Sequence, residues 1–335
     1  MHRDINKALI ITHANCADGL LSAVVVTNYL QRNTDITYDI QYWPCSYSVE
    51  EEAELLNHLN NNPVRYIFCV DFSLSVQLIK SIHLIKDAHK YKLADKLFIY
   101  DHHASAIKLY MEDTNVRKEL NSLPYVHIIL DASECGSTLA FKQLFSPACK
   151  LPEVLKYVKD RDLWQHIYGK DTYAMHMYIK RIMNTEQLPM LVTKPNEAYA
   201  RLVEKAMHLL DDYNVPVAMQ EGYELLTEYE IDIQKHADRG VPMLWNWSLE
   251  PLDVVVVSKL PKEYVSDVGN LLVNRYNTVA MLFAEGSHSV SLRSSESVDI
   301  DVSYIAALYG GGGHKYAAGF SYSDNLLQEL LLRLS

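Results

Sequence analysis

Residues able to bind metal or move protons stand at the ends of apolar segments in the first half of this chain. Asp101, His102 and His103 directly follow the apolar segment 96–100, which reads KLFIY. Ordinary strand ends are finished by glycine, asparagine or proline, which turn the chain at low steric cost. A carboxylate and two imidazoles in that place indicate metal binding or acid–base chemistry instead.

The same pattern recurs after other apolar segments. His13 ends one of them and is followed by Asn15, Cys16 and Asp18, while Asp71 follows another. Carboxylates that converge without a cation repel one another and raise one another's pKa values. Divalent metal removes that conflict, and carboxylates with imidazoles suit Mn²⁺ or Mg²⁺, with Co²⁺ or iron as alternatives. Two ions about 3.5–4 Å apart, sharing one carboxylate, would activate a water and shield a phosphoryl oxygen.

Three further aspartates of this half lie near the ends of expected strands or helices. Asp131 precedes a serine-containing turn and is interpreted as a turn former. Asp160 and Asp162 belong to the segment KDRDLW, at the end of an expected helix.

Alternating strands and helices would have to position these side chains. Unbroken apolar segments, typical of strands covered on both faces, predict strands over 8–13, 36–43, 65–73, 96–103 and 126–131. Helical patterns lie between them, over 20–31, 49–59 and 137–145. This alternation predicts a doubly wound parallel sheet, whose ligands bind at the carboxyl ends of the strands.

The fold class is therefore α/β in three parts. We expect a metal-binding catalytic domain over 1–195, a helical connector over 196–245 and a smaller mixed α/β domain over 246–335. The last part contains strand patterns, a glycine run over 310–313 and a short helical tail. Apolar helices in the connector are compatible with a homodimer.

Bulk properties limit the function. The net charge of −11 over 335 residues disfavours a long duplex held in a basic groove, because such binding needs many Lys and Arg contacts. Five scattered cysteines without a CxxC pair argue against disulfides and structural zinc, and favour a reducing cytoplasm. We find neither a signal peptide at the start nor an apolar segment of membrane-spanning length, so no membrane partner is expected.

With its motifs taken together, the chain resembles the DHH phosphoesterase superfamily, in the branch with the DHH-associated C-terminal domain. The resemblance rests on His13 with Asp18-Gly19, on Asp71 in VDFS, on the DHH triplet and on GGGGHKYAAGF over 310–320. It covers nearly the whole chain. The branch includes RecJ-type exonucleases, nanoRNA phosphodiesterases, pAp phosphatases and cyclic-dinucleotide phosphodiesterases.

The resemblance implies a role for each matching residue. Asp71 would bridge two metals, and His13 would bind the first. The second would be held by Asp18, His102 and Asp160, the last preferred to Asp162 because its spacing fits the family's final aspartate. His103 would face the scissile phosphate, and Asp101 would orient a neighbouring imidazole.

The first motif departs from the family pattern. Cys16 stands where the family usually has its first aspartate, with Asn15 beside it. The first metal could therefore use the Asn15 carbonyl or the Cys16 thiolate, or bind only with substrate, and a softer site could prefer another metal.

The C-terminal motif implies a phosphate grip. Gly311, Gly312 and Gly313 can present backbone N–H groups to an anion, and His314 with Lys315 would add charge. Arg293 can clamp phosphate oxygens, with Ser291 and Ser294 nearby. Trp164 and Tyr316 could stack on a base, although packing is the commoner role for such aromatics.

Metal-dependent phosphodiester hydrolysis of short oligonucleotides or small, including cyclic, nucleotides is the function that we predict. Nucleoside monophosphates would be the products. The alternatives are a RecJ-like single-strand exonuclease, which should need a basic channel, and a non-catalytic nucleotide-binding protein, which the missing first aspartate would allow. RNA or DNA preference and polarity of attack stay open.

Overall fold

The structure is a computed structural model that describes residues 6–32, 36–46, 49–88, 96–186, 197–248 and 250–335. Within these residues, no helix combines the length and the apolar character that crossing a bilayer requires. By its internal contacts the chain divides into two compact units, residues 1–226 and residues 227–335, which are described separately below.

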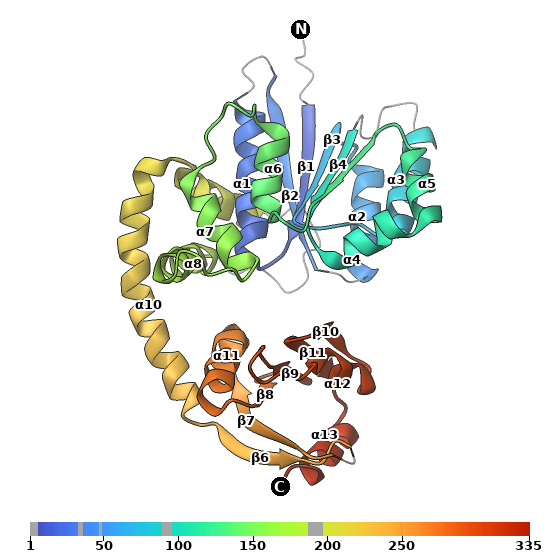
Figure 1. The fold of residues 1–335 in the computed structure, drawn as a ribbon. Coiled ribbons are helices and arrows are strands. Elements are labelled where there is room, and N and C mark those ends of the chain that lie inside the picture. The colour runs from blue at the N-terminus through green and yellow to red at the C-terminus, as the bar shows by residue number, and fades with distance from the viewer. Residues whose placement is uncertain (1–5, 33–35, 47–48, 89–95, 187–196, 249) are drawn as a thin grey trace. The chain divides into compact units, whose positions relative to one another are not determined.

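The first unit is built on a five-stranded sheet in which every pair is parallel (Figure 1). The strands are β1 (Asn6–His13), β2 (Tyr38–Cys45), β3 (Tyr66–Val70), β4 (Lys96–Asp101) and β5 (Val126–Leu130). Their spatial order is β2-β1-β3-β4-β5, so the direction of winding reverses between β1 and β3. Ligands of such sheets bind outside the carboxyl ends of the strands at that switch point.

Helices cover both faces of this sheet (Figure 1), as the unbroken apolar strands predicted. One face packs against α1 (Ala17–Gln31), α6 (Gly136–Leu144), α7 (Glu153–Asp162), α8 (Lys170–Met183) and α9 (Glu197–Ala206). The other packs against α2 (Val49–Asn61), α3 (Val76–Ala88), the π-helix η1 (Lys108–Glu112) and α5 (Thr114–Asn121). In β1, Ala8 and Ile10 face the first group and Leu9 and Ile11 the second. The strands are therefore buried on both sides and held rigidly.

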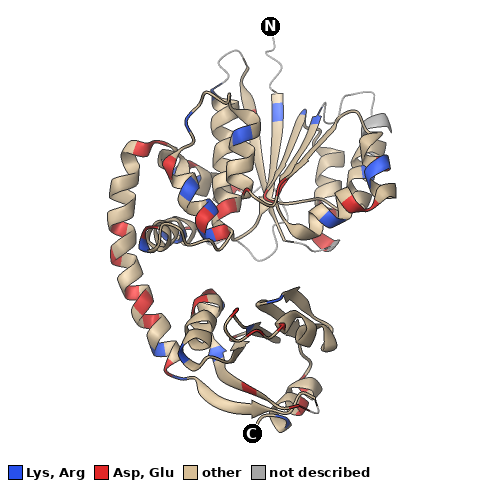
Figure 2. Cartoon of the chain, in the orientation of Figure 1, with Lys and Arg blue, Asp and Glu red and all other residues tan. Residues whose placement is uncertain are grey.

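Short elements complete the first unit. The four-residue helix α4 (Ala104–Ile107) follows the DHH triplet, and the 3-10 turns η2 (Met207–Leu210) and η3 (Asp212–Asn214) follow α9. Helix α10 (Val215–Ala237) then runs through the division between the units. Its acidic positions are marked along the helix in Figure 2.

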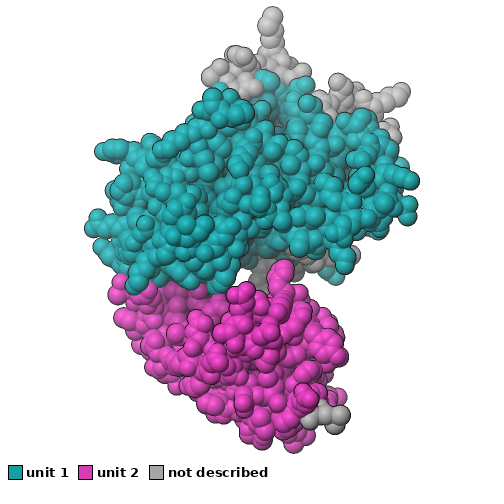
Figure 3. Space-filling model, viewed as in Figure 1, with its two compact units in different colours: residues 1–226 teal, residues 227–335 magenta. Residues whose placement is uncertain are grey.

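The second unit, magenta in Figure 3, contains a six-stranded mixed sheet in the order β10-β11-β9-β8-β7-β6. Its elements are β6 (Val241–Trp245), β7 (Leu252–Leu260), η4 (Lys262–Tyr264), α11 (Val265–Tyr276), β8 (Val279–Ala284), β9 (Ser289–Arg293), α12 (Val302–Leu308), β10 (Gly312–His314), β11 (Ala317–Ser321) and α13 (Asp324–Leu332). Only β7 and β8 pair in parallel among these described strands. Helix α11 packs on one face, and α12 and α13 pack on the other.

The expected α/β class is confirmed, with a doubly wound parallel sheet first and a smaller mixed unit last. The expected boundary at 195/196 lies outside the described residues. The segment 241–245, which we assigned to the connector, forms β6 and pairs with β7, so it belongs to the sheet of the second unit.

Candidate metal centre

The candidate centre lies at the switch point of the parallel sheet. Strand β1 ends at His13, Asp71 follows β3 and β4 ends at Asp101. Because these strands are adjacent and parallel, their carboxyl ends meet at one edge. The structure thus brings together three of the strand ends from which the sequence predicted a metal site.

Asp71 is the residue that this edge encloses most tightly. Its backbone adopts the left-handed region with φ 54°, and its N–H donates to the Tyr100 carbonyl at 3.0 Å. The side chain is 1% exposed, and among the described residues its Oδ2 has no hydrogen-bond partner. Burial, and then the charges of Asp18 and Asp162, raise the pKa of this carboxyl well above its usual value. A non-glycine residue kept in a strained conformation with an unsatisfied buried oxygen suggests a ligand that the protein chain does not supply.

His102 lies among three carboxylates. Its Nε2 is 3.1 Å from Asp71 Oδ1, 3.3 Å from Asp162 Oδ2 and 4.0 Å from Asp18 Oδ2. One imidazole nitrogen cannot satisfy three carboxylates, whereas a divalent cation can bind all four groups.

Asp18 is anchored by the amino end of another helix. The side chain is 1% exposed, and its carboxylate accepts hydrogen bonds from Gly136 N at 2.5 Å, Ser137 N at 3.0 Å and Ser137 Oγ at 2.5 Å. These donors begin α6, and a helix amino end stabilises a negative charge. Asp18 is therefore oriented toward the centre before any ligand binds.

Two glycines allow the backbone to pack closely against the residues of the centre. A Cβ at Gly19 would lie 2.4 Å from the His13 carbonyl oxygen, and one at Gly136 would lie 2.5 Å from Asp71 Cβ. Both contacts are too close for any side chain, so glycine is required at each position. Gly136 and Ser137 escaped the sequence interpretation, although a Gly-Ser pair opening a helix after the fifth strand is a recognisable signal for an anion-binding helix start.

The choice between the two late aspartates requires correction. Asp160 lies outside the cluster: its carboxylate accepts hydrogen bonds from Ile167 N at 2.8 Å, Tyr168 N at 3.2 Å and the Thr172 hydroxyl. Burial would raise the pKa of Asp160, but these bonds outweigh it and lower the pKa. The Asp160 carboxylate thus stabilises the loop between α7 and α8 through these hydrogen bonds.

Asp162 takes the position that we assigned to Asp160. It forms a group with Asp18 and His102 whose ligand atoms lie within 4.8 Å of one another. Burial, and then the charge of Asp18, raise the pKa of Asp162 to about 7. Two residues apart at a helix end, the two side chains leave the helix in different directions, and only Asp162 faces the centre.

Within the DHH triplet, Asp101 forms hydrogen bonds that orient His103. Asp101 is fully buried and accepts hydrogen bonds from Ser73 Oγ at 2.6 Å and His103 Nδ1 at 2.7 Å. Burial would raise the pKa of Asp101, but the bonds from His103 and Ser73 hold it below its usual value. Burial lowers the pKa of His103 and the Asp101 carboxylate raises it, with a net rise. Asp101 thereby fixes the orientation of the His103 ring, the arrangement expected from the sequence.

The altered first motif also reaches the centre. One ring nitrogen of His13, the Cys16 sulfur and one Asp71 oxygen lie within 4.8 Å of one another. Burial, followed by the charges of Asp71 and Asp18, raises the pKa of the Cys16 thiol well above its usual value. Asn15 is exposed and forms a turn with φ 55°, which sets the chain direction before α1.

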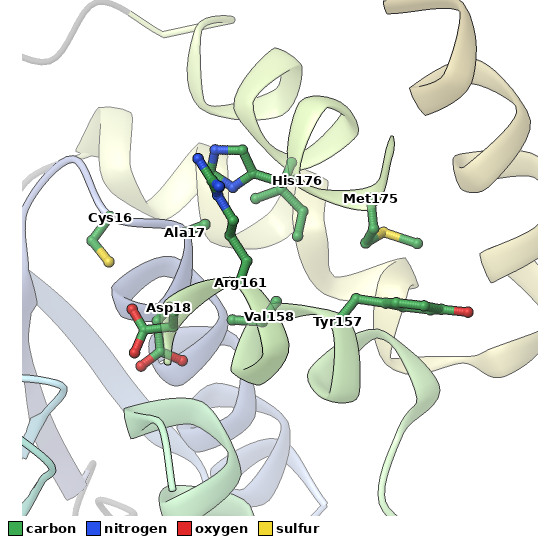
Figure 4. A pocket seen from close by; sticks show the side chains of 10 residues that line it. Cys16, Ala17, Asp18, Tyr157, Val158, Arg161, Met175 and His176 are labelled. Atoms are coloured by element: carbon green, nitrogen blue, oxygen red, sulfur yellow. The ribbon is translucent and has the colours of Figure 1, made fainter. Parts of the chain in front are cut away.

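A cavity of about 80 Å³ adjoins these residues (Figure 4). Cys16, Asp18 and Asp162 line it together with Arg161 and His176. Burial, followed by the charge of Arg161, lowers the pKa of His176 to about 3. The cavity therefore combines acidic groups with a cationic guanidinium.

Trp164, for which base stacking and packing were both considered, contacts Arg161. The Arg161 guanidinium carbon lies 4.3 Å from the Trp164 ring centroid and 4.8 Å from that of Tyr173. This contact positions the guanidinium.

Asp131 accepts hydrogen bonds from the backbone N–H and the hydroxyl of Ser133, in keeping with its interpretation as a turn former.

In the second unit, the expected substrate residues share one region of the sheet. Pairing through β11 places Arg293, Ala317 and His314 in one row, and Ser291, Gly319 and Gly312 in another row two residues along the strands, where side chains return to the same face. Directly opposed residues of antiparallel strands point to the same face. Arg293, Ser291 and His314 therefore face the same side of the sheet.

Arg293 is held against α11. Its guanidinium donates to the Leu292 carbonyl at 2.9 Å and to Ser266 Oγ at 3.2 Å, and burial lowers the pKa of Arg293.

The glycine run allows strands to pair closely. Gly313 has φ 143°, and a Cβ at Gly311 would lie 2.1 Å from the Gly319 carbonyl oxygen. Lys315 forms an ion pair with Asp299 at 2.9 Å.

No known protein family has a sequence profile that matches the chain. An uncharacterized protein of Acanthamoeba polyphaga mimivirus, R106, is 23% identical over 324 residues, which cover 94% of this chain and 67% of that protein. RecJ from Thermus thermophilus, solved in complex with Mn²⁺, is similar over 99% of this chain and 52% of its own length, with a TM-score of 0.52 and 15% identity. The pGpG-specific phosphodiesterase PggH from Vibrio cholerae is similar over 98% of this chain and 96% of its own, with a TM-score of 0.48 and 12% identity.

The likeness to RecJ shows the fold. The chain has the RecJ-type fold, which is the fold that the sequence resemblance implied. The chain spans about half the length of that RecJ structure.

Proposed function

We propose that the chain is a metal-dependent phosphodiesterase that hydrolyses short oligonucleotides or small nucleotides, cyclic ones included, to nucleoside monophosphates. The observation that carries the proposal is Asp71, whose buried carboxylate has one oxygen without a hydrogen-bond partner among the described residues. Imidazoles and further carboxylates converge on it from neighbouring strand ends. Such a donor set fits a divalent cation.

The same residues suggest how two ions would be held. His13, Cys16 and Asp71 would hold one, and Asp18, His102 and Asp162 with Asp71 would hold the other. Bound cations at such a centre lower the pKa of a water and neutralise charge on a phosphoryl group. The Mn²⁺ in the similar RecJ structure supports manganese as an occupant.

His103 would contact the substrate directly. Because its Nδ1 donates to Asp101 at 2.7 Å, Nε2 is the nitrogen that would face a phosphoryl oxygen or the leaving group. The raised pKa of His103 favours the protonated ring, which can donate a hydrogen bond or a proton there.

The second unit would hold the terminal phosphate or nucleotide. Arg293 can bind phosphate oxygens bidentately, and Ser291 and His314 face the same side of the sheet. The exposed glycines Gly311, Gly312 and Gly313 let an anion approach the backbone closely.

Charge limits the length of substrate that the protein would hold. The chain carries 42 acidic and 31 Lys and Arg residues. Lys and Arg positions in the described chain are dispersed over many elements (Figure 2). A few phosphates are therefore a better match than a long strand, whose binding depends on many cationic contacts.

The test is hydrolysis by the purified protein with Mn²⁺. Substrates are RNA and DNA strands from dinucleotides upward, cyclic dinucleotides and pAp, with nucleoside monophosphates measured as products. We expect turnover of at least one short substrate, its loss in His102→Ala, and normal turnover in His127→Ala, which removes an exposed histidine of the same unit. Tight binding without product from every substrate would instead favour a nucleotide-binding protein.

A single-strand exonuclease is the second candidate, favoured by the fold shared with RecJ. A length series of single-stranded DNA separates the two. A small-substrate enzyme loses efficiency beyond a few nucleotides, whereas an exonuclease gains efficiency with length and releases successive mononucleotides without dissociating.

A further inference from the structure

The two halves of the candidate centre differ in chemistry. One half contains a sulfur donor, Cys16, with His13 and Asp71, all with ligand atoms within 4.8 Å of one another. The other half contains only oxygen and nitrogen donors, from Asp18, His102 and Asp162, with Asp71 beside His102 at 3.1 Å.

Cys16 is placed to act as a ligand. It precedes α1 in an extended conformation, and its side chain makes no capping hydrogen bond to that helix. Cys16 as a residue is only partly buried, unlike the cysteines of the core. An independent sign of a ligand is Asp71 Oδ2, which is buried and, within the described chain, has no hydrogen-bond partner.

Three other cysteines of the first unit are buried away from the candidate metal groups. Cys45 and Cys69 are buried in the core, where the Cys69 thiol donates to the Phe72 carbonyl at 2.9 Å. Cys135 is fully buried at the start of α6, within reach of Ser137 and Thr138 hydroxyls. Among the candidate metal groups of the described residues, Cys16 is the only cysteine.

The donor types then select different metals. Thiolate with imidazole favours Zn²⁺, and also accepts Co²⁺, over Mn²⁺ or Mg²⁺. Three protein ligands with one position left for water is the usual composition of a catalytic zinc site. Carboxylates with a single imidazole suit Mn²⁺ or Mg²⁺.

We propose that the centre is a mixed-metal site, with Zn²⁺ on His13, Cys16 and Asp71 and Mn²⁺ on Asp18, Asp71, His102 and Asp162. The proposal rests on the metal centre of the proposed function and assigns Cys16 the role of selecting the metal. Replacing the thiolate by an oxygen donor removes the selection of Zn²⁺ over Mn²⁺, and both sites then have a similar preference for Mn²⁺.

Metal content of the wild-type protein is the first measurement. The chelator-treated chain is dialysed against one equivalent of Zn²⁺ per chain and a large excess of Mn²⁺, because zinc at equal concentration would displace manganese from oxygen and nitrogen ligands as well. The retained metals are then measured by mass spectrometry. We expect one Zn²⁺ and one Mn²⁺ per chain. Two Mn²⁺, or two Zn²⁺, would overturn the proposal without any need for a variant.

Cobalt provides a spectroscopic measurement of the sulfur ligand. Co²⁺ added to the metal-free protein should give the near-ultraviolet charge-transfer absorption of a thiolate–cobalt bond. The band should be present in the wild type and in Cys149→Ser, which removes an exposed cysteine, and absent in Cys16→Ser and Cys16→Asp. A band that survives in Cys16→Ser contradicts the assignment.

Affinity completes the test. Cys16→Ser should weaken Zn²⁺ binding by more than the roughly 10–100-fold that loss of an outer partner costs, because a direct ligand is lost. Cys16→Asp should bind two Mn²⁺. Circular dichroism confirms that each variant is folded before its metals are counted.

This inference and the proposed function can fail separately. A wild-type protein that binds two Mn²⁺ and hydrolyses short oligonucleotides refutes the mixed-metal site and keeps the function. A protein that binds Zn²⁺ and Mn²⁺ but turns over none of the substrates keeps the mixed-metal site and refutes the function.

Discussion

Asp71 is placed where ionising a carboxyl group is unfavourable. It is buried beside Asp18 and Asp162, and these surroundings raise its pKa well above the usual value. Without cations, such a carboxylate destabilises the fold, and functional sites commonly carry a cost of this kind. Binding and stability should therefore respond in opposite directions to its removal.

Asp71→Asn should stabilise the metal-free protein and weaken metal binding. Asparagine keeps the size, tolerates the left-handed backbone and removes the charge. We expect a gain of about 1 kcal/mol, or a rise in Tm of about 2–4 °C, measured with chelator present. The control Asp39→Asn, at an exposed position of β2, should change neither property. A metal-free Tm that falls would contradict this interpretation of Asp71.

The aspartate pair of α7 allows a second test at this scale. Asp160→Asn should destabilise the protein by about 1–3 kcal/mol, because a buried carboxylate loses charge-assisted bonds from Ile167, Tyr168 and Thr172. Asp162→Asn should leave stability nearly unchanged and weaken Mn²⁺ binding. Denaturant unfolding and calorimetric Mn²⁺ titration measure the two effects. The reverse result, with Asp160→Asn impairing metal binding alone, would restore our sequence-based choice.

Residue types alone predicted most of the candidate cluster. His13, Asp71 and His102 each stand at or next to a strand end, and parallel strands deliver their ends to one edge. Asp162 was named but ranked below Asp160, because the sequence does not specify which side of a helix end faces the sheet. That direction follows from how α7 packs, which depends on residues far away in the chain.

At the scale of elements, periodicity predicted all five parallel strands. It did not predict their order, because buried apolar segments are interchangeable by composition and pairing depends on the helical crossovers. The segment 104–121, which forms α4, η1 and α5, was left unassigned. Gly312 and Gly313 form part of edge strand β10, to which the sequence analysis assigned no strand, since glycine is unfavourable in strands without a close packing partner.

Glu134 connects the helix behind Asp18 to the helix that carries Asp162. It is 7% exposed and accepts hydrogen bonds from Lys142 of α6 at 2.7 Å and Lys159 of α7 at 2.8 Å. Burial would raise the pKa of Glu134, but the two lysines outweigh it and lower the pKa. A lowered pKa means that the ionised form stabilises the folded state above the ordinary pKa of 4.5, and that this contribution is lost as the pH falls through the folded-state value.

Glu134→Gln should therefore cost roughly 1 kcal/mol at pH 7, a modest value because both lysines are partly solvated. The difference from wild type should shrink below about pH 4.5, measured by denaturant unfolding across a pH series. Glu119→Gln removes a solvent-exposed ion pair with Lys80 and should change stability by less than about 0.5 kcal/mol. A difference that grows toward acid pH would contradict the assigned role of Glu134.

For the molecule as a whole, the net charge limits how many phosphates of a substrate the protein can contact. A chain with a net charge of −11 can bind an anion only where cations gather locally. Such binding should release few counterions. For contact with two or three phosphates of a single strand, the slope of log affinity against log salt should be about −2.

The slope can be measured as the salt dependence of KM for a dinucleotide and for a strand of about 24 nucleotides. We expect the same shallow slope for both, because the additional nucleotides would meet no cationic surface. A slope that becomes steeper with length would indicate an extended binding channel and favour the exonuclease interpretation.

Everything proposed for this protein requires that the acids and imidazoles at the carboxyl edge of the parallel sheet share divalent cations. Anomalous diffraction at the manganese absorption edge, from crystals grown with excess Mn²⁺, tests it most directly. We expect an anomalous peak within bonding distance of Asp71 and His102. Well-diffracting crystals without a peak there, and with these side chains directed apart, would contradict it.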